Sequence, residues 1–294
     1  MSLSTPLVVG AGYTGARLAR RLAAAAPVTA LCAHAETAHA VHSAAITGRV
    51  LDLDRDATQN GALADLGAIG PLIYLVPPPP HGDTDPRLER LIAQLPMPPE
   101  RFVYVSTTGV YGNTDGTSVD EDSPPNPQTA RARRRLAAEE QVRGYVRDQR
   151  SAFTILRVPG IYGPGRLPLE RLRRGDPVLD PCDAGITNRI QVEDLVDALV
   201  LCATHSAAAN RIYNVTDGHP SSTTEYLETL ARLAGLPPPR RIRRADATAH
   251  YSTEALSFLD ESRRVESRRI REELGFTPLF ADLSDGLRAS LAAS

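Results

Sequence analysis

The stretch Leu7-Val-Val-Gly10-Ala-Gly12-Tyr-Thr-Gly15 joins a short apolar run to an alanine-rich helical segment over 16–26. The first glycine permits a tight turn, the second lets a diphosphate approach the backbone, and the third lets the helix pack closely on its strand. Unpaired N–H groups at the start of that helix would face the same place. We therefore predict a dinucleotide site here, although a glycine-rich turn without a ligand would show the same spacing.

Apolar runs and helical periods alternate along the chain that follows, as expected for a parallel sheet covered by helices. The patterns predict strands over 28–32, 49–53, 71–76, 102–106, 153–158 and 211–215. They predict helices over 87–95, 131–147, 192–203, 223–233 and 265–274, the last ended by Gly275.

The predicted fold class is α/β: a doubly wound parallel Rossmann sheet with a smaller C-terminal α+β substrate lid. The turn-forming triplet Gly163-Pro164-Gly165 marks the boundary. Residues 1–162 are expected to form the dinucleotide-binding domain, with 190–215 returning to it. Residues 163–189 and 216–294 are expected to form the lid.

All 33 basic residues counted as Lys or Arg are arginine, so the chain has no lysine. Arginine stabilises anions but cannot act as a base. A net charge of -2 gives no general attraction to nucleic acid or to an anionic membrane. No secretory signal or long apolar run is visible, and the three cysteines, Cys32, Cys182 and Cys202, suit a reducing cytoplasm. Their spacing to the histidines gives no zinc motif, so we expect no metal.

Six phrases resemble the extended short-chain dehydrogenase/reductases, the family of the NAD-dependent sugar epimerases and dehydratases. They occur in the family's order over nearly the whole chain: Gly10 to Gly15, Tyr104-Val-Ser-Thr-Thr-Gly-Val-Tyr111-Gly112, Leu156-Arg157-Val-Pro-Gly-Ile-Tyr162-Gly163-Pro164-Gly165, Ile190-Gln-Val-Glu-Asp194, Ile212-Tyr-Asn214-Val and Glu273-Leu-Gly275-Phe. The resemblance implies a small-molecule substrate. It also suggests a homodimer paired through 131–147, because many relatives pair through this helix.

The family's proton-transfer pair, a tyrosine followed four residues later by lysine, is absent from this chain. The matching positions are Arg131 and Arg135, and no tyrosine lies between Tyr111 and Tyr145. The resemblance places Thr107 at the family's hydroxyl position, so Thr107, Arg131 and Arg135 are the candidate catalytic residues. An asparagine usual in nucleotide-sugar enzymes is replaced by Gly160. The pattern thus resembles the atypical extended members, whose active-site residues are altered.

The resemblance also implies which residues contact the cofactor and the substrate. The implied cofactor contacts are Gly10, Gly12, Tyr13, Thr14, Gly15, His34, Asp52, Leu53, Val76, Pro77, Pro78, Ser106 and Pro159. The implied substrate contacts are Thr108, Tyr111, Gly160 and Arg166. The second strand ends without an acid for the ribose hydroxyls or an arginine for a phosphate. His34 is the nearest candidate for a phosphate contact, so NAD or NADP is expected, with NADP slightly favoured. A lone surface histidine is, however, more often only solvated.

Two groups of charged residues have alternative interpretations. The arginine runs over 131–135, 171–174 and 240–244 could hold phosphate or nucleic acid, but solvated helix faces are the favoured interpretation. The acids Asp120, Glu121 and Asp122 could replace the missing proton carrier, but a polar loop is favoured.

Three functions stay open at this point. The first is an NAD(P)-dependent oxidoreductase or epimerase-like enzyme in which Thr107 polarises the substrate and Arg131 or Arg135 stabilises an oxyanion. The second is a non-catalytic dinucleotide-binding sensor or regulatory module. The third is a nucleotide-sugar epimerase that recruits a base from elsewhere in the chain.

Overall fold

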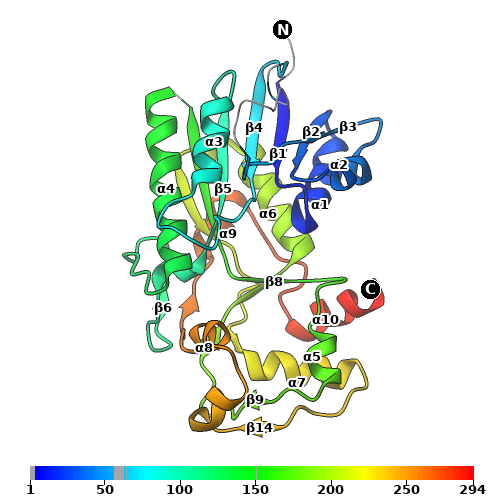
Figure 1. The fold of residues 1–294 in the computed structure, drawn as a ribbon, viewed down its shortest axis with the longest axis vertical. Helices are drawn as coiled ribbons and strands as arrows, with labels where there is room; N and C mark the ends of the chain where they lie inside the picture. The colour runs from blue at the N-terminus through cyan, green and yellow to red at the C-terminus, as the bar shows by residue number, and fades with distance from the viewer. Residues whose placement is uncertain (1–3, 56–62, 64, 150) are drawn as a thin grey trace.

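A seven-stranded sheet forms the centre of the molecule in the computed structural model, which describes residues 4–55, 63, 65–149 and 151–294 (Figure 1). The strand order is β12-β7-β5-β4-β1-β2-β3, and all neighbouring strands are parallel. The strands are β1 (Thr5–Val9), β2 (Val28–Cys32), β3 (Ile46–Val50), β4 (Ile69–Tyr74), β5 (Arg101–Thr107), β7 (Ala152–Val158) and β12 (Arg211–Asn214). This confirms the predicted doubly wound α/β fold.

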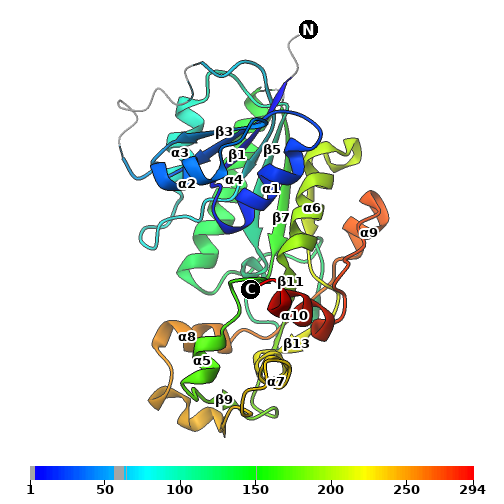
Figure 2. The same cartoon turned by 90° about the vertical axis from the view of Figure 1, so that its right-hand side faces the viewer.

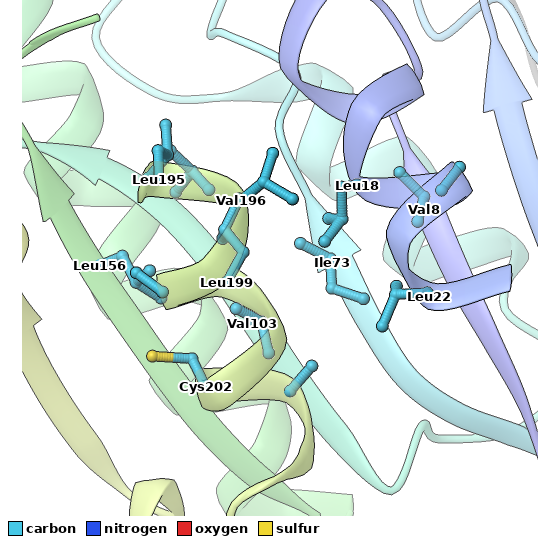
Figure 3. Close-up of a cluster of buried hydrophobic side chains, with 14 of the residues drawn as sticks. Val8, Leu18, Leu22, Ile73, Val103, Leu156, Leu195, Val196, Leu199 and Cys202 are labelled. Atoms are coloured by element: carbon cyan, nitrogen blue, oxygen red, sulfur yellow. The ribbon is translucent and has the colours of Figure 1, made fainter. Parts of the chain in front are cut away.

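Helices cover both faces of this sheet, as parallel strands require. One face packs against α1 (Tyr13–Ala23), α2 (Ala35–Val41) and α6 (Val192–Thr204), and the other against α3 (Pro86–Gln94) and α4 (Ala130–Gln149). On the first face, Leu18 and Leu22 of α1 meet Leu199 of α6 over the strands (Figure 3). The apolar faces of these helices therefore make the two main cores.

Strand order reverses between β1 and β4. The chain runs from β1 outward through β2 and β3, then returns to place β4 on the other side of β1. The loops after β1 and β4 therefore leave the sheet in opposite directions and open a crevice at the carboxyl ends of the strands. Ligands of open α/β sheets bind at such a switch point.

A smaller layer of helices and short strands lies beyond the carboxyl ends of the sheet (Figure 2). Its helices are α5 (Leu169–Arg173), α7 (Thr223–Leu233), α8 (Thr253–Leu259) and α10 (Leu283–Ala292). Its short strands pair as β9 (Val178–Leu179) with β14 (Arg241–Ile242) and β10 (Ile186–Thr187) with β13 (Ser221–Ser222). Two further pairs connect the layers: β8 (Gly160–Tyr162) with β11 (Arg189–Gln191), and β6 (Ser118–Val119) with β15 (Arg264–Val265). Three 3₁₀ turns are also present: η3 (Thr108–Tyr111), η4 (Ser206–Ala208) and η5 (Arg244–Ala249).

The segment after α9 (Arg268–Leu274) returns to the main sheet. Ile270 and Phe276 belong to the same apolar core as the first helix. Asp194, buried on α6, accepts hydrogen bonds from the backbone N–H groups of Leu279 at 2.7 Å and Phe280 at 3.0 Å. Residues near 270–280 are thus part of the Rossmann half, although they follow most of the smaller layer in sequence.

Three predicted elements begin three residues away from their start in the structure, and the predicted strand 71–76 is shifted by two residues from Ile69–Tyr74. The third strand covers Ile46–Val50 rather than 49–53, because residues after Val50 leave the sheet to line the crevice. The last charged helix begins at Arg268 rather than 265, because Arg264–Val265 pairs with β6. The first helix begins at Tyr13 rather than 16, directly after Gly12. Gly275 ends α9 at a left-handed φ of 68°, as predicted.

Candidate functional site

The glycine turn between β1 and α1 has the geometry that its sequence predicts. Gly10 has a φ of +92°, and a Cβ there would lie 2.9 Å from the side chain of Val76. A Cβ on Gly15 would lie 2.3 Å from the carbonyl oxygen of Gly10, so only glycine allows the helix to pack so closely. A Cβ on Gly12 would have no neighbour within 4 Å. The backbone at Gly12 therefore faces open space rather than protein.

The N-terminus of α1 is open to an anion. Gly12, its N-cap residue, offers no side-chain hydrogen bond, and the first turn contains no acidic residue. The first N–H groups of a helix lack intrahelical partners and carry a partial positive charge. A diphosphate fits this position because the turn supplies donors, positive potential and room for close approach.

A cavity of about 730 Å³ begins at this turn and follows the carboxyl ends of β1, β2, β4, β5 and β7. We call it the dinucleotide crevice. Its lining includes the following predicted residues: Gly10, Gly12, Tyr13, Thr14, Gly15, His34, Asp52, Leu53, Val76, Pro77, Ser106, Thr107, Arg135, Pro159 and Arg166. The fold therefore brings together residues from eight separate segments of sequence.

The outer end of the crevice lies beside β2 and β3. Ala33, His34 and Thr37 line it after β2, and Asp52 lines it after β3. The nearby Arg87 is already engaged, because its guanidinium donates two hydrogen bonds to the Asp54 carboxylate at 2.7 Å and 2.6 Å. The residues at the tip of β2 thus include neither a carboxylate nor an arginine, and the NADP preference stays a prediction.

A second cavity of about 490 Å³ adjoins the crevice. Both cavities are lined by Pro77, Thr107, Arg135 and Pro159, so these four residues mark where they meet. The second cavity also takes in the predicted residues Pro78, Thr108, Arg131 and Gly160. We call it the arginine cavity, because its lining includes Arg131, Arg134, Arg135, Arg189 and Arg263.

Thr107 lies at the junction of the two cavities, at the end of β5. Its Oγ1 accepts a hydrogen bond from the backbone N–H of Gly109 at 3.1 Å, which fixes the side chain as the N-cap of η3. A hydroxyl group has one donor in addition to its acceptor sites. The Thr107 hydroxyl hydrogen can therefore point to a ligand oxygen while the lone pair holds the turn.

Ser106, the residue before Thr107, is hydrogen-bonded to a buried ion pair. Its hydroxyl donates to Glu139 of α4, and Arg157 of β7 donates to the same carboxylate at 3.1 Å and 2.7 Å. Glu139 and Arg157 are 1% and 3% exposed. This network fixes α4 against β5 and β7 directly behind Thr107.

The arginines of α4 turn toward the arginine cavity rather than to solvent. Arg134 is 7% exposed, and Arg131 and Arg135 are partly buried. Arg135 donates to the Val105 carbonyl at 2.9 Å and approaches the Tyr104 hydroxyl at 3.4 Å. The prediction of a solvated face was wrong for these three, because 131, 134 and 135 share one side of the helix. Within that run, Arg133 is the exposed one.

The other two arginine runs lie mostly at the surface, as predicted. Among their members, Arg173, Arg174, Arg241, Arg243 and Arg244 each pair with a carboxylate of the described chain. The acidic trio also fits its favoured interpretation. Asp120 accepts from Ser123 within a turn, and Glu121 accepts from the backbone N–H of Asn214. None of these three acids lines either cavity.

The lid side of the arginine cavity contains residues that the sequence analysis did not single out. Arg189, on β11, is 8% exposed and stacks over the Tyr226 ring at 4.4 Å from its centroid. Glu261 lies between Arg131, at 3.2 Å, and Arg263. Arg131 also covers the Phe258 ring, 3.5 Å from its centroid. These residues carry no motif, because they come from a loop-rich part of the chain.

Few groups lining the arginine cavity could carry a proton. Glu261 is the one carboxylate in its described lining, and it is shared by two guanidinium groups. Burial raises the pKa of Tyr104, behind Arg135, to about 12, so this phenol stays protonated. Tyr111, predicted as a substrate contact, lines neither cavity. It is buried, and its hydroxyl donates to Asn214 at 2.8 Å.

Comparison with known proteins identifies relatives of the chain. The sequence profile of the family described as NAD dependent epimerase/dehydratase matches residues 87–216. The chain is 30% identical to protein YeeZ of Escherichia coli K12 over 183 residues, which cover 62% of this chain and 59% of that protein. It is 31% identical to the 3-diazoavenalumate denitrifying reductase of a Streptomyces species over 180 residues, 58% of each chain. These alignments thus span less than two thirds of the curated relatives.

The likeness extends over the whole fold in a solved structure. A functionally unknown conserved protein from Silicibacter pomeroyi DSS superposes with a TM-score of 0.81 at 28% identity, covering 98% of both chains. Among the described residues, we find no helix with the length and apolarity needed to cross a membrane.

The family description agrees with the motifs, the sheet order and the crevice. It names NAD, the expected class of cofactor, and its members are epimerases and dehydratases. Residues 87–216 of the chain match the NAD dependent epimerase/dehydratase family, and the whole fold is similar to a solved structure of the same architecture.

Proposed function

We propose that the chain is an oxidoreductase or epimerase-like enzyme that binds a nicotinamide dinucleotide in the crevice and a small molecule in the arginine cavity. The observation that carries this proposal is the junction of the two cavities at Thr107 and Arg135. A substrate atom can approach the cofactor only where the two spaces meet. One polar hydroxyl and one cation stand at that point.

The residues that would hold the cofactor are those of the glycine turn and the strand ends. The N–H groups at the start of α1 would bind the diphosphate, and Asp52 and Leu53 would lie beside the adenosine end. When bound, the dinucleotide supplies or accepts a hydride. The name of the Streptomyces relative, a reductase, supports a net reduction as one outcome.

Thr107 and Arg135 would stabilise negative charge that develops on a substrate oxygen. Thr107 keeps its hydroxyl hydrogen for that oxygen, since its lone pair is held by Gly109. Arg135 is positioned by the Val105 carbonyl and presents a guanidinium cation. Such preoriented donors act without a titrating base at positions 131 and 135. Solvent or the substrate itself would then supply the proton.

Binding is tested first, by calorimetric titration of the purified protein with NAD, NADH, NADP and NADPH. Gly12→Ala would place a methyl group in the open space of the crevice, so we expect weaker binding of the preferred nucleotide with little change in stability. Gly144→Ala, in α4, is the matched control, because a Cβ there also has no neighbour within 4 Å. Failure of all four nucleotides to bind the wild-type protein would overturn the proposal.

Turnover is tested with small carbonyl and hydroxyl compounds by following the absorbance of reduced nicotinamide. Thr107→Val should lower the rate about a hundredfold or more, since one preoriented donor is lost. Thr204→Val, at the exposed end of α6, should leave the rate unchanged. Tight nucleotide binding without turnover on any compound would favour the alternative of a non-catalytic sensor, which the absence of a proton carrier at 131 and 135 also supports.

A further inference from the structure

Arg189 is a buried cation without a counterion. It is 8% exposed and lines the arginine cavity from the lid side. Its guanidinium donates to the Ser221 hydroxyl at 3.0 Å and approaches the Thr223 hydroxyl at 3.4 Å, both neutral groups. No carboxylate lies within 4.0 Å of it in the ranges that the structure describes. Its position is therefore fixed while its charge is not neutralised.

Burial of a charge without a partner is unfavourable, which makes this arrangement informative. Desolvation lowers the pKa of Arg189, the direction expected for a cation without a close anion. The carboxylates that influence it from beyond ion-pair distance are Asp217 and Glu225; Asp217 is buried, and burial raises the pKa of Asp217 to about 7. Asp217 is therefore a poor counterion at neutral pH. An anion entering the cavity would supply the missing charge.

Two further arginines in the lining of the cavity, both from α4, are in the same situation. Arg134 donates to the Gly82 carbonyl at 3.0 Å and Arg135 to the Val105 carbonyl, and neither pairs with a described carboxylate. By contrast, Arg131 and Arg263 share Glu261. The described lining of the cavity thus holds five guanidinium groups and one carboxylate, and Arg134 and Arg135 of α4 and Arg189 of β11 form no ion pair with a described carboxylate.

We propose that the substrate is a small molecule with two acidic groups, carboxylate or phosphate, one bound by Arg189 and the other by Arg134 and Arg135. This inference rests on the proposed function, because it names the substrate class of the same site. Arg135 keeps its Nε and Nη2 donors free of described protein partners, and Arg189 likewise has donors left for a ligand. Guanidinium groups bind such oxyanions in a bidentate, charge-assisted manner.

The arginine cavity offers a nucleobase one aromatic ring for stacking among its described lining residues. Phe258 is the one aromatic residue in its described lining, and Arg131 covers one face of that ring. A base could stack only on the remaining surface of this ring, which is 53% exposed. A nucleoside diphosphate sugar is therefore the contrasting ligand, and the experiment includes it.

The test measures binding of succinate, glutarate, phosphoglycolate, propionate and UDP-glucose by calorimetry, with and without bound NAD. Succinate, glutarate and phosphoglycolate, which each have two acidic groups, should bind at least tenfold more tightly than propionate, which has one. Arg189→Gln should weaken dianion binding tenfold or more, since charge-assisted hydrogen bonds are lost. Comparing the affinities for succinate and glutarate with the affinity for phosphoglycolate shows whether the site prefers a second carboxylate or a phosphate. The matched control is Arg101→Gln, which removes another arginine without an ion pair at the opposite end of β5.

The outcomes separate this inference from the proposed function. Equal affinity for glutarate and propionate, an Arg189→Gln variant that binds dianions as well as wild type, or binding of UDP-glucose alone would each overturn the dianion proposal. NAD binding is measured on its own and should survive Arg189→Gln, because Arg189 does not line the dinucleotide crevice. Dianion binding without any nucleotide binding would overturn the proposed function and leave the anion site standing.

Discussion

The dinucleotide crevice and the arginine cavity share four residues but are built in different ways. The crevice depends on backbone: three glycines, a helix N-terminus and strand ends that the sheet brings together. The arginine cavity depends on side chains from α4, β11 and the segment around α8. A site formed by the backbone of a fold can serve many different reactions, whereas the side chains of the neighbouring cavity determine which small molecule binds there. The fold itself therefore builds the crevice through its backbone, whereas the arginine cavity depends on the side chains that this sequence places around it.

The largest expected effect concerns the ion pair behind the junction. Glu139→Ala leaves Arg157 buried without its partner and should lower the free energy of unfolding by about 3–5 kcal/mol. Urea denaturation measures this change. The control is Glu140→Ala. The side chain of Glu140 is 63% exposed, so its removal should change the free energy of unfolding by less than about 0.5 kcal/mol. Equal effects of the two variants would show that the network does not support the site.

A second variant compares two glycines of the crevice. Gly15→Ala forces a methyl group against the Gly10 carbonyl, so it should cost about 1–3 kcal/mol of stability and weaken nucleotide binding. Gly12→Ala should weaken binding without that cost in stability. Thermal unfolding and calorimetry on both variants measure the two effects. If Gly15→Ala were as stable as wild type, close packing of α1 on β1 would not explain the glycine.

A third prediction concerns the pH dependence of stability on the lid side. The folded-state pKa of Asp217 is about 7, above the unfolded value of about 3.9, so the folded state binds this proton more tightly. Its contribution to stability is complete below the unfolded pKa and is lost as the pH rises toward 7. Asp217→Asn should therefore reduce the fall in urea midpoint between about pH 4 and pH 7. Asp148→Asn, at a side chain that is 70% exposed, should keep the wild-type slope.

The smallest expected effect is on the stability of an arginine-cavity variant. Arg189→Met removes a buried charge together with its hydrogen bonds to Ser221 and Thr223, two changes that oppose each other. The net change in unfolding free energy should stay within about 1 kcal/mol. Loss of several kcal/mol in urea denaturation would show that Arg189 supports the fold rather than a ligand.

The crevice could be predicted from the sequence because its signals are local. Gly10, Gly12 and Gly15 lie within six residues; the turn at Gly10 and the close packing at Gly15 require glycine, and Gly12 leaves its backbone open to the crevice. The alternation of apolar runs and helical periods likewise predicted the strands and helices of the main sheet. The predicted boundary of a helix was wrong where a tertiary contact sets its start: Val265 pairs with β6 as part of β15 and does not belong to the helix.

The arginine cavity could not be predicted in the same way. The run over 131–135 was visible, but a helix with arginine on nearly every side gives no indication of which face is buried. Arg189 precedes a recognised phrase and carried no signal of its own. Its importance comes from Ser221, Thr223 and Tyr226, which lie more than 30 residues away in sequence. Such a site depends on the folded arrangement of the lid.

The return of residues 270–280 to the main sheet has a consequence for biosynthesis. Ile270, Leu274 and Phe276 complete the core that α1 and α6 begin, and Leu279 and Phe280 satisfy the Asp194 carboxylate. A nascent chain that has emerged from the ribosome only as far as α6 therefore still lacks part of this core. The part of the chain that forms the main sheet can therefore complete this core only after the intervening smaller layer has been translated.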